Sequence, residues 1–325
     1  MSPTTLDASR FIDGSVADRI DFARDLVSCL DKDGFVKLRN HGIPRQVIKE
    51  MFSWAKRFFD LSMEAKMSCA NAGGPRPARG FSSHEKSAKL EPGNEGLLDA
   101  VDELESLNIG PIHDTKYPNQ WIAEEVLPSF RHHVENYYTA LQKTANIVIE
   151  AIELGLDLPA GSMLSRAFPD RSEVRLNHYP SISKRQLCNK NIRRIWPHTD
   201  FGILSLLIQD SEGGLEFEDR RSPGTFIPVT SKDSSDLIVN AADILQRWTN
   251  GVLKAGLHQV TVPRQVQIDG TDSMLPPRYS LAFFLRPGDE NSAGPIRDFV
   301  TEERPACYDE ISALEHLRRR NGLVY

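Results

Sequence analysis

The sequence contains few cysteines, and their spacing does not predict a metal-binding knuckle or a redox motif. Cys29, Cys69, Cys188 and Cys307 lie far apart in a chain of 325 residues, and no C-x-x-C pair is present. Zinc-finger and thioredoxin-like interpretations therefore have little support.

Positive charge and long apolar runs are also scarce. The formal net charge is −6, which argues against nucleic acid as a partner. The basic run Arg318–Arg320 is interpreted as a solvated helix face. No apolar run reaches membrane-spanning length, and the N-terminus lacks a basic stretch followed by an apolar core. We therefore expect a cytoplasmic protein that binds neither membranes nor nucleic acid, and its oligomeric state is left open.

The composition that remains is that of an ordinary globular enzyme, with 26% charged and 40% hydrophobic residues. A chain of this length can bury a full core, as one large or two closely joined domains. Apolar spacing, proline and glycine predict helices at 15–31, 44–59, 128–154 and 309–320, with Gly155 ending the third. A strand is expected at 34–38, a long loop at 71–93 and many short strands from 174 to 285. The fold class is therefore α+β.

Two H-x-[DE] motifs occur, and their contexts differ. His133-Val-Glu135 lies in an expected helix, where residues i and i+2 point about 200° apart. His198-Thr-Asp200 lies in 196–209, which we expect to be one strand, and there i and i+2 share a face. Only the second pair is expected to converge on a metal ion.

His258 is the candidate third ligand, on an expected strand at 257–263. Taken alone, it is as readily a hydrogen-bonded core histidine. Arg278-Tyr-Ser280 follows on another expected strand and supports the functional interpretation. Two histidines and one carboxylate form the facial ligand set of non-haem Fe(II) oxygenases.

In this order and spacing, His198-x-Asp200, His258 and Arg278-x-Ser280 resemble the iron- and 2-oxoglutarate-dependent dioxygenases. The branch concerned includes isopenicillin N synthase and the plant flavonoid and gibberellin oxidases. The segments 34–44 (GFVKLRNHGIP) and 177–180 (NHYP) resemble further signatures of that branch. The resemblance covers nearly the whole chain, from about Asp18 onward.

The resemblance implies a double-stranded β-helix (jelly-roll) core with a helical N-terminal region. It divides the chain into an N-terminal region, 1–125, and a catalytic core, 126–325. It implies Fe(II) held by His198, Asp200 and His258, with O2 and 2-oxoglutarate as co-substrates.

The co-substrate residues follow from the same resemblance. Arg278 can pair in a bidentate manner with the distal carboxylate of 2-oxoglutarate, and Ser280 can donate one more hydrogen bond. Tyr179 and Asn177 are expected to contact the co-substrate by position. The alternative for Tyr179 is a core tyrosine with a satisfied hydroxyl group.

The implied reaction releases succinate and CO2 and oxidises a small organic metabolite by hydroxylation, desaturation or rearrangement after hydrogen abstraction. The weak N-terminal signature and an apparent insertion at 184–193 indicate a microbial, fungal member in secondary metabolism. Candidate substrate residues are Phe201, Phe81 and Arg194, with Arg79 and the region near Leu314. Packing is an equal alternative for Phe201, and a surface arginine is the preferred alternative for Arg194.

Two other functions stay open. A same-fold Fe(II) oxidase that does not use 2-oxoglutarate can keep the arginine-x-serine pair, so the motif does not exclude it. A non-catalytic ligand-binding protein is the other alternative, and the intact ligand set argues against it.

Overall fold

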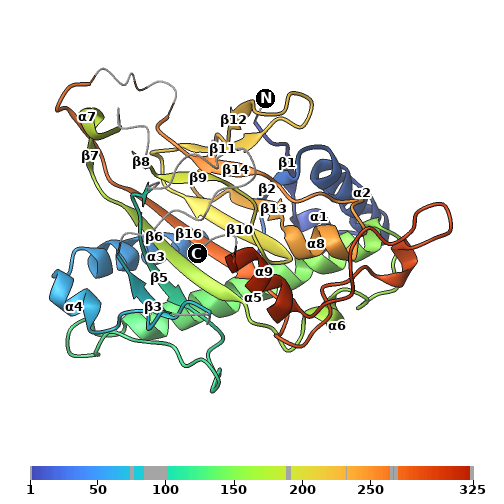
Figure 1. Cartoon of the computed structure of the whole chain (residues 1–325), viewed down its shortest axis with the longest axis horizontal. Helices are drawn as coiled ribbons and strands as arrows, with labels where there is room; N and C mark the ends of the chain where they lie inside the picture. Colours follow the sequence, from blue (N-terminus) through green and yellow to red (C-terminus); the bar gives the residue numbers. More distant parts are fainter. Residues whose placement is uncertain are drawn as a thin grey trace.

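The structure is a computed structural model, and it describes residues 2–73, 77–83, 101–187, 192–231, 233–263, 266 and 270–322. Two sheets form its centre (Figure 1). The larger has eight strands in the order β1-β2-β13-β10-β16-β6-β5-β3, and the smaller has four in the order β12-β11-β14-β9. This arrangement confirms the expected α+β fold with a jelly-roll core.

The strands of the large sheet are β1 (Thr5–Asp7), β2 (Phe35–Arg39), β13 (Leu237–Ala241), β10 (Leu204–Gln209), β16 (Arg278–Leu285), β6 (Glu173–Tyr179), β5 (Glu105–Ile109) and β3 (Gly80–Ser82). The small sheet comprises β12 (Phe226–Pro228), β11 (Leu215–Glu218), β14 (His258–Val260) and β9 (Ile195–His198). Two short pairs complete the strands: β4 (Val101–Asp102) with β8 (Ile192–Arg193), and β7 (Ile182–Ser183) with β15 (Met274–Leu275).

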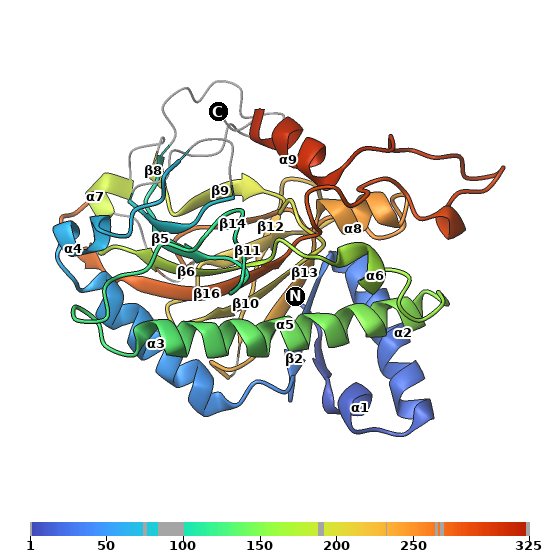
Figure 2. The ribbon, with the colours of Figure 1, turned by 90° about the horizontal axis from the view of Figure 1, so that it is seen from below.

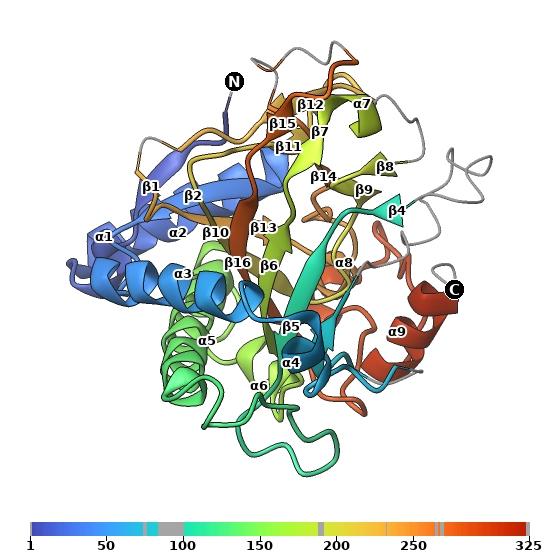
Figure 3. The ribbon, with the colours of Figure 1, turned by 90° about the vertical axis from the view of Figure 1, so that its left-hand side faces the viewer.

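The helices are α1 (Ser9–Ile12), α2 (Val16–Asp33), α3 (Arg45–Phe59), α4 (Met63–Met67), α5 (Phe130–Gly155), α6 (Leu164–Ala167), α7 (Lys184–Leu187), α8 (Asp243–Trp248) and α9 (Ala313–Gly322), with a 3₁₀ turn at Arg297–Phe299. The helices α2, α3 and α5 lie on one side of the large sheet, and α9 lies on the other (Figures 2 and 3). No helix in the described ranges is long and apolar enough to cross a membrane.

The two faces of the large sheet differ in chemistry because side chains alternate along each strand. On β10, Leu204, Leu206 and Ile208 are fully buried in the main core. That core also contains apolar residues of α2, α3 and α5, so this face is the helix-packed face. Ser205 and Gln209 point to the opposite, inner face. A smaller apolar cluster, which includes Phe35 of β2 and Phe217 of β11, joins the two sheets there.

Helix ends show where sequence signals were sufficient and where they were not. Ser15 caps α2 in a reciprocal arrangement with Asp18, and Gly34 ends the helix with φ of 70°. The helix expected at 15–31 is therefore confirmed. The helix α5 ends at Gly155, as expected, although Leu156 rather than this glycine is the C-cap residue. A β carbon at Gly155 would lie 2.4 Å from the Ala23 carbonyl oxygen, so glycine permits close packing of α5 on α2.

The expectation of one strand over 196–209 is wrong. The chain forms β9 up to His198 and resumes as β10 at Leu204, and these strands belong to different sheets. Gly202 lies in the connection, where a β carbon would be 2.5 Å from the Leu285 carbonyl oxygen. The chain therefore turns from one sheet to the other beside β16, and Asp200 lies in that turn.

Two other boundaries also need correction. The loop expected at 71–93 contains the strand β3, while its residues 74–76 and 84–93 lie outside the described residues. The last helix begins at Ala313 rather than at 309. Asp309 instead accepts hydrogen bonds from Arg247 and Arg319, which tie the segment before the helix to α8 and to α9 itself.

Candidate metal centre and co-substrate pocket

His198, Asp200 and His258 come together at one point between the two sheets. One ligand atom from each of them lies within 4.8 Å of the others. His198 on β9 and His258 on β14 are direct register partners. Asp200 Oδ1 is 3.6 Å from His198 Nε2, and Asp200 Oδ2 is 3.8 Å from His258 Nε2. The sequence identified these three residues correctly as a cluster, although a turn rather than a shared strand face brings Asp200 into it.

Both imidazole rings are oriented by the backbone. His198 Nδ1 lies 2.8 Å from the Trp196 carbonyl oxygen, and His258 Nδ1 lies 3.0 Å from that of Gly256. A carbonyl oxygen only accepts, so Nδ1 carries the proton in each ring. The Nε2 lone pairs are therefore left to face the cluster, which is the tautomer that a metal ligand needs.

Two polar residues hold the Asp200 carboxylate. Ser205 Oγ donates to Asp200 Oδ2 at 2.5 Å, and Asn240 Nδ2 donates to the same oxygen at 3.0 Å. Ser205 and Asn240 are register partners on β10 and β13. Sequence reasoning missed both. The available signal was a polar residue at an inner position of each of two otherwise apolar strands.

The two histidines of the metal cluster favour the charged form of the Asp200 carboxylate. Burial alone would raise the pKa of Asp200, but His258 and His198 outweigh it, and the pKa lies below its ordinary range. Burial, followed by the neighbouring His198, lowers the pKa of His258 to about 4. Burial would also lower the pKa of His198, but Asp200 outweighs it and the pKa is raised. A carboxylate and two imidazoles with fixed tautomers, all held by hydrogen bonds, suit a divalent iron.

The other H-x-[DE] motif takes no part in this cluster. His133 lies on α5, where its Nδ1 is 2.8 Å from the Ser129 carbonyl oxygen and its ring packs on Trp54. The expectation that this motif is helical is confirmed.

Arg278 is the centre of a second polar group on the inner face. Its side chain is fully buried, and its guanidinium donates to the Gly213 carbonyl oxygen at 2.7 Å and to Gln209 Oε1 at 2.9 Å. Ser280 Oγ is 3.5 Å from Arg278 Nη1, and Asn177 Nδ2 donates to the same hydroxyl at 3.2 Å. The structure therefore joins Arg278, Ser280 and Asn177 in one hydrogen-bonded group.

Tyr179 completes this group as the register partner of Arg278. Its ring centroid is 4.6 Å from the Arg278 guanidinium carbon. Among the described residues, no carboxylate forms an ion pair with Arg278, and Asn177 Oδ1 is buried without a hydrogen-bond partner. A buried cation without a counter-charge is costly, so the pocket suits an anionic ligand such as the distal carboxylate of a keto diacid.

The two candidate aromatic residues of the substrate pocket, Phe81 and Phe201, lie in different places. Phe81 pairs with Leu107 and packs against Phe58 in the main core, on the helix-packed face. The prediction that Phe81 lines the substrate pocket is therefore wrong. Phe201, directly after Asp200, is half-buried, and the Arg320 guanidinium of α9 lies 4.9 Å from its ring.

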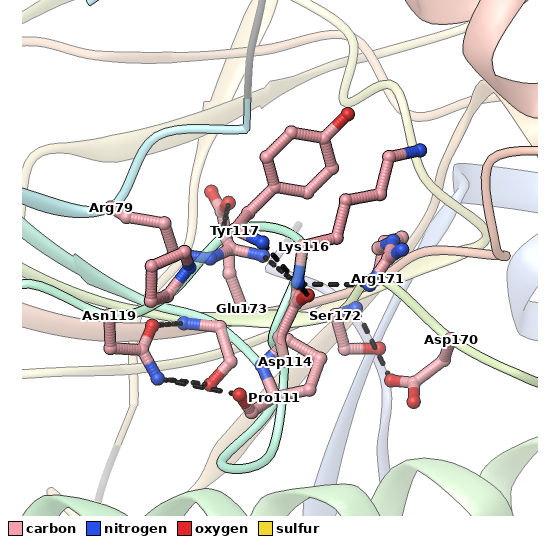
Figure 4. Close-up of polar contacts among 12 residues, drawn as sticks. Arg79, Pro111, Asp114, Lys116, Tyr117, Asn119, Asp170, Arg171, Ser172 and Glu173 are labelled. Atoms are coloured by element: carbon pink, nitrogen blue, oxygen red, sulfur yellow. Dashed lines mark hydrogen bonds and ion pairs between the residues drawn. The ribbon is translucent and has the colours of Figure 1, made fainter. Parts of the chain in front are cut away.

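Two arginines suggested by the sequence are both buried. The surface interpretation of Arg194 is wrong, because the residue is 3% exposed. Arg79 lies within a network of ion pairs and hydrogen bonds with Glu173 and Asp114 (Figure 4). Glu173 is at the opposite end of β6 from Tyr179, the register partner of Arg278. The region near Leu314 belongs to α9, whose Arg320 donates to Thr199 Oγ1 between two of the clustered residues.

Comparison with known proteins agrees with this geometry. Residues 4–124 match the family model described as non-haem dioxygenase in morphine synthesis N-terminal, and residues 172–287 match that of the 2OG-Fe(II) oxygenase superfamily. The second range contains all three clustered residues and the Arg278 group.

Individual relatives cover the whole chain. The 2-oxoglutarate-dependent dioxygenase ecdK of Aspergillus rugulosus is 42% identical over 100% of both chains. The proline hydroxylase buaE of Petromyces alliaceus is 37% identical over 98% of both. The crystal structure of a full-length Neurospora crassa protein in complex with alpha-KG and thymine superposes with a TM-score of 0.88 at 27% identity, covering 99% of this chain and 97% of that one. The chain belongs to the 2OG-Fe(II) oxygenase superfamily and is a 2-oxoglutarate-dependent dioxygenase.

Proposed function

We propose that His198, Asp200 and His258 bind Fe(II) in this enzyme. The observation that carries the assignment is the convergence of their ligand atoms within 4.8 Å, with both imidazole Nδ1 atoms already hydrogen-bonded to carbonyl oxygens. The ligand set and the fixed tautomers support iron rather than a structural zinc site, because three protein ligands leave positions open for other molecules.

We propose further that Arg278, Ser280, Asn177 and Tyr179 bind 2-oxoglutarate. The fully buried guanidinium of Arg278 offers a planar fork to the distal carboxylate, and lysine would not reproduce that geometry. Asn177 orients the Ser280 hydroxyl from the neighbouring strand. When bound, Fe(II), 2-oxoglutarate and O2 together supply the oxidative chemistry, with release of succinate and CO2.

The organic substrate that we propose is a small polar metabolite of fungal secondary metabolism, of the size of an amino acid or a nucleobase. The names of two relatives support this size, since one is a proline hydroxylase and another was crystallised with thymine. The residues beside the metal cluster that suit a pocket wall are Phe201 and the α9 side chain Arg320 that packs on it.

A titration without oxygen tests the site directly. Fe(II) is added to the purified protein, then 2-oxoglutarate, and a weak visible charge-transfer band is followed. A band that saturates supports one shared site for iron and keto acid. Iron binding without a band, together with oxygen uptake that needs no 2-oxoglutarate, would instead support the same-fold oxidase.

Turnover is then tested by succinate formation. L-proline and thymine are used as probes of the proposed size class, with 2-oxoglutarate alone as the baseline. Succinate formed above the baseline with either probe supports a substrate of this class. A chain that bound neither iron nor 2-oxoglutarate would be a ligand-binding member of the fold.

We also propose a division of the chain into two regions, a cellular location and the absence of two classes of partner. A division into an N-terminal region, 1–125, and a catalytic core, 126–325, is supported by the two family models, which lie on either side of residue 125. The described cysteines Cys29, Cys69 and Cys307 are free thiols, which supports a reducing, cytoplasmic location. We also propose that nucleic acid and membranes are not partners.

A further inference from the structure

Arg194 is a second buried arginine beside the Arg278 group. It lies in the bend before β9, the strand that carries His198. Its guanidinium carbon is 5.9 Å from the centroid of the Tyr179 ring, and that of Arg278 is 4.6 Å from the same centroid. Two buried cations therefore lie within 6 Å of the centre of one tyrosine ring.

The surroundings of Arg194 leave its charge uncompensated. It donates one hydrogen bond, from Nη2 to the Pro276 carbonyl oxygen at 3.0 Å, while its Nε is buried without an acceptor. Among the described residues, no carboxylate lies within ion-pair distance of Arg194. Asp210 and Glu212 act on it only at longer range.

The charge of Arg278 also acts on Arg194. Burial, followed by the positive charge of Arg278, lowers the pKa of Arg194. Two like charges that are buried close together without an anion oppose folding. A fold that keeps them is explained most simply if a ligand supplies the missing negative charge.

We propose that Arg194 is a specificity-determining residue for the co-substrate, which holds the distal carboxylate of the keto acid together with Arg278. This inference rests on the proposed binding of 2-oxoglutarate in the Arg278 pocket. Arg278, on the large sheet, would contact the carboxylate from one side of Tyr179. Arg194, in the bend before β9, would contact the same carboxylate from the small sheet. It would thereby link the co-substrate to the strand that carries His198.

Two buried arginines favour a keto acid that carries a distal carboxylate over one that does not. A keto acid with a distal carboxylate compensates both cations, whereas one that ends in a methyl group compensates neither. We therefore expect Arg194 to contribute to the preference for 2-oxoglutarate over 2-oxovalerate, which has the same chain length without the distal carboxylate.

The experiment compares the affinity of the full-length protein for these two keto acids. Calorimetry with Mn(II) in place of Fe(II) gives the dissociation constants, and the visible band with Fe(II) gives an independent value. Removal of one charge-assisted contact in Arg194→Gln is expected to weaken 2-oxoglutarate binding by about 10- to 100-fold. The affinity for 2-oxovalerate is expected to stay unchanged.

Two further variants sharpen the test. Arg194→Lys keeps the charge but loses the planar fork, so an intermediate affinity for 2-oxoglutarate is expected. Arg193→Gln is the matched control, because Arg193 is adjacent in sequence but bonds to Gln259 and lies against Trp196. Its affinity for both keto acids should equal that of the wild type.

The possible outcomes distinguish a failure of the role proposed for Arg194 from a failure of the proposed 2-oxoglutarate binding. Unchanged 2-oxoglutarate affinity in Arg194→Gln would overturn the inference. An equal loss of affinity for both keto acids would also overturn it, since that result indicates a structural role. Failure of the wild type to bind 2-oxoglutarate at all would instead refute the proposed function.

Discussion

Buried cations occur in two kinds of surroundings in this protein. In the first kind, Arg79 Nη1 lies 3.3 Å from Glu173 Oε2 (Figure 4), and Arg286 Nη1 lies 3.3 Å from the same oxygen. In the second kind, Arg194 and Arg278 have no carboxylate partner among the described residues, although both are at most 3% exposed. The first group is neutralised by the protein itself, and the second is not.

A further compensated group lies on the helix-packed face. Lys66 Nζ is 3.0 Å from Glu105 Oε2, and His178 Nδ1 is 3.1 Å from the same oxygen. All three side chains are largely buried. Where a buried charge serves only the fold, this protein therefore places an opposite charge beside it. The absence of an anion at Arg194 and Arg278, within the part of the chain that the structure describes, therefore indicates a ligand site rather than poor packing.

The largest expected effect is a loss of turnover on substitution in the metal cluster, which lies on the same inner side as Arg194 and Arg278. Asp200→Ala removes the one carboxylate of the cluster, and we expect turnover to be abolished because two imidazoles alone do not hold the iron. Iron content of the purified variant and succinate formation measure this. Full activity in Asp200→Ala would refute the ligand assignment, while a matched circular dichroism spectrum shows that the fold is kept.

Arg278→Gln tests the uncompensated side of the comparison. Loss of a buried charge that faces the distal carboxylate is expected to weaken 2-oxoglutarate binding by about 100-fold or more. The free energy of unfolding without ligand should not fall, because the substitution removes a buried charge that has no carboxylate partner among the described residues. Calorimetry and urea unfolding measure the two quantities. A large loss of stability with unchanged affinity would mean that Arg278 is a structural residue.

Glu173→Gln tests the compensated side and is expected to give the reverse result. It leaves Arg79 and Arg286 without their shared carboxylate, so we expect the free energy of unfolding to fall by about 3–5 kcal/mol. The affinity for 2-oxoglutarate should stay unchanged. The control is Asp60→Asn, which breaks the exposed pair of Lys56 and Asp60 and should have no measurable effect on unfolding.

Much of the site could be predicted from the sequence because its chemistry requires particular residue types. His198, Asp200 and His258 were identifiable by kind and order, and Arg278 by the need for a cation. The geometric reason given for Asp200 was wrong, however. The close approach of Gly202 to Leu285 depends on a strand more than 80 residues away, and no local pattern records such a contact.

The burial of polar residues was the part that the sequence did not reveal. Arg194 lies in a polar stretch and was interpreted as a surface residue, because its neighbours Tyr179 and Pro276 are distant in the chain. Ser205 and Asn240 were missed for the same reason, since their function depends on the register between β10 and β13. The helix over 15–31 was predicted well, because both its apolar spacing and its capping contacts are local in sequence.

Ser205→Ala tests how far the support of the metal cluster extends. The substitution removes the shorter of two hydrogen bonds to Asp200 Oδ2 and leaves that of Asn240. Loss of such an outer hydrogen bond typically lowers metal affinity by about 10- to 100-fold. Competition with a chelator measures the Fe(II) affinity. Asn240→Ala is expected to behave alike, and unchanged affinity in both variants would remove these residues from the site.

The smallest expected effect concerns acid. Burial alone would raise the pKa of Glu105, but hydrogen bonds from His178 and Lys66 outweigh it and lower the pKa below its ordinary value. A carboxyl with a depressed folded pKa contributes stability above its unfolded pKa and loses it as the pH falls through the folded pKa. Acid should therefore weaken the Lys66–Glu105–His178 group, whereas Arg194 and Arg278 have no carboxylate partner to protonate among the described residues.

Glu105→Gln measures this contribution when unfolding is followed in urea from neutral pH down to an acidic pH below the ordinary carboxyl range. The variant should be less stable than the wild type at neutral pH, and the difference should shrink as the pH falls. A difference that stayed constant over the whole range would mean that the Glu105 charge contributes nothing. In that case, neutralisation by the protein would not be what distinguishes the two kinds of buried cation.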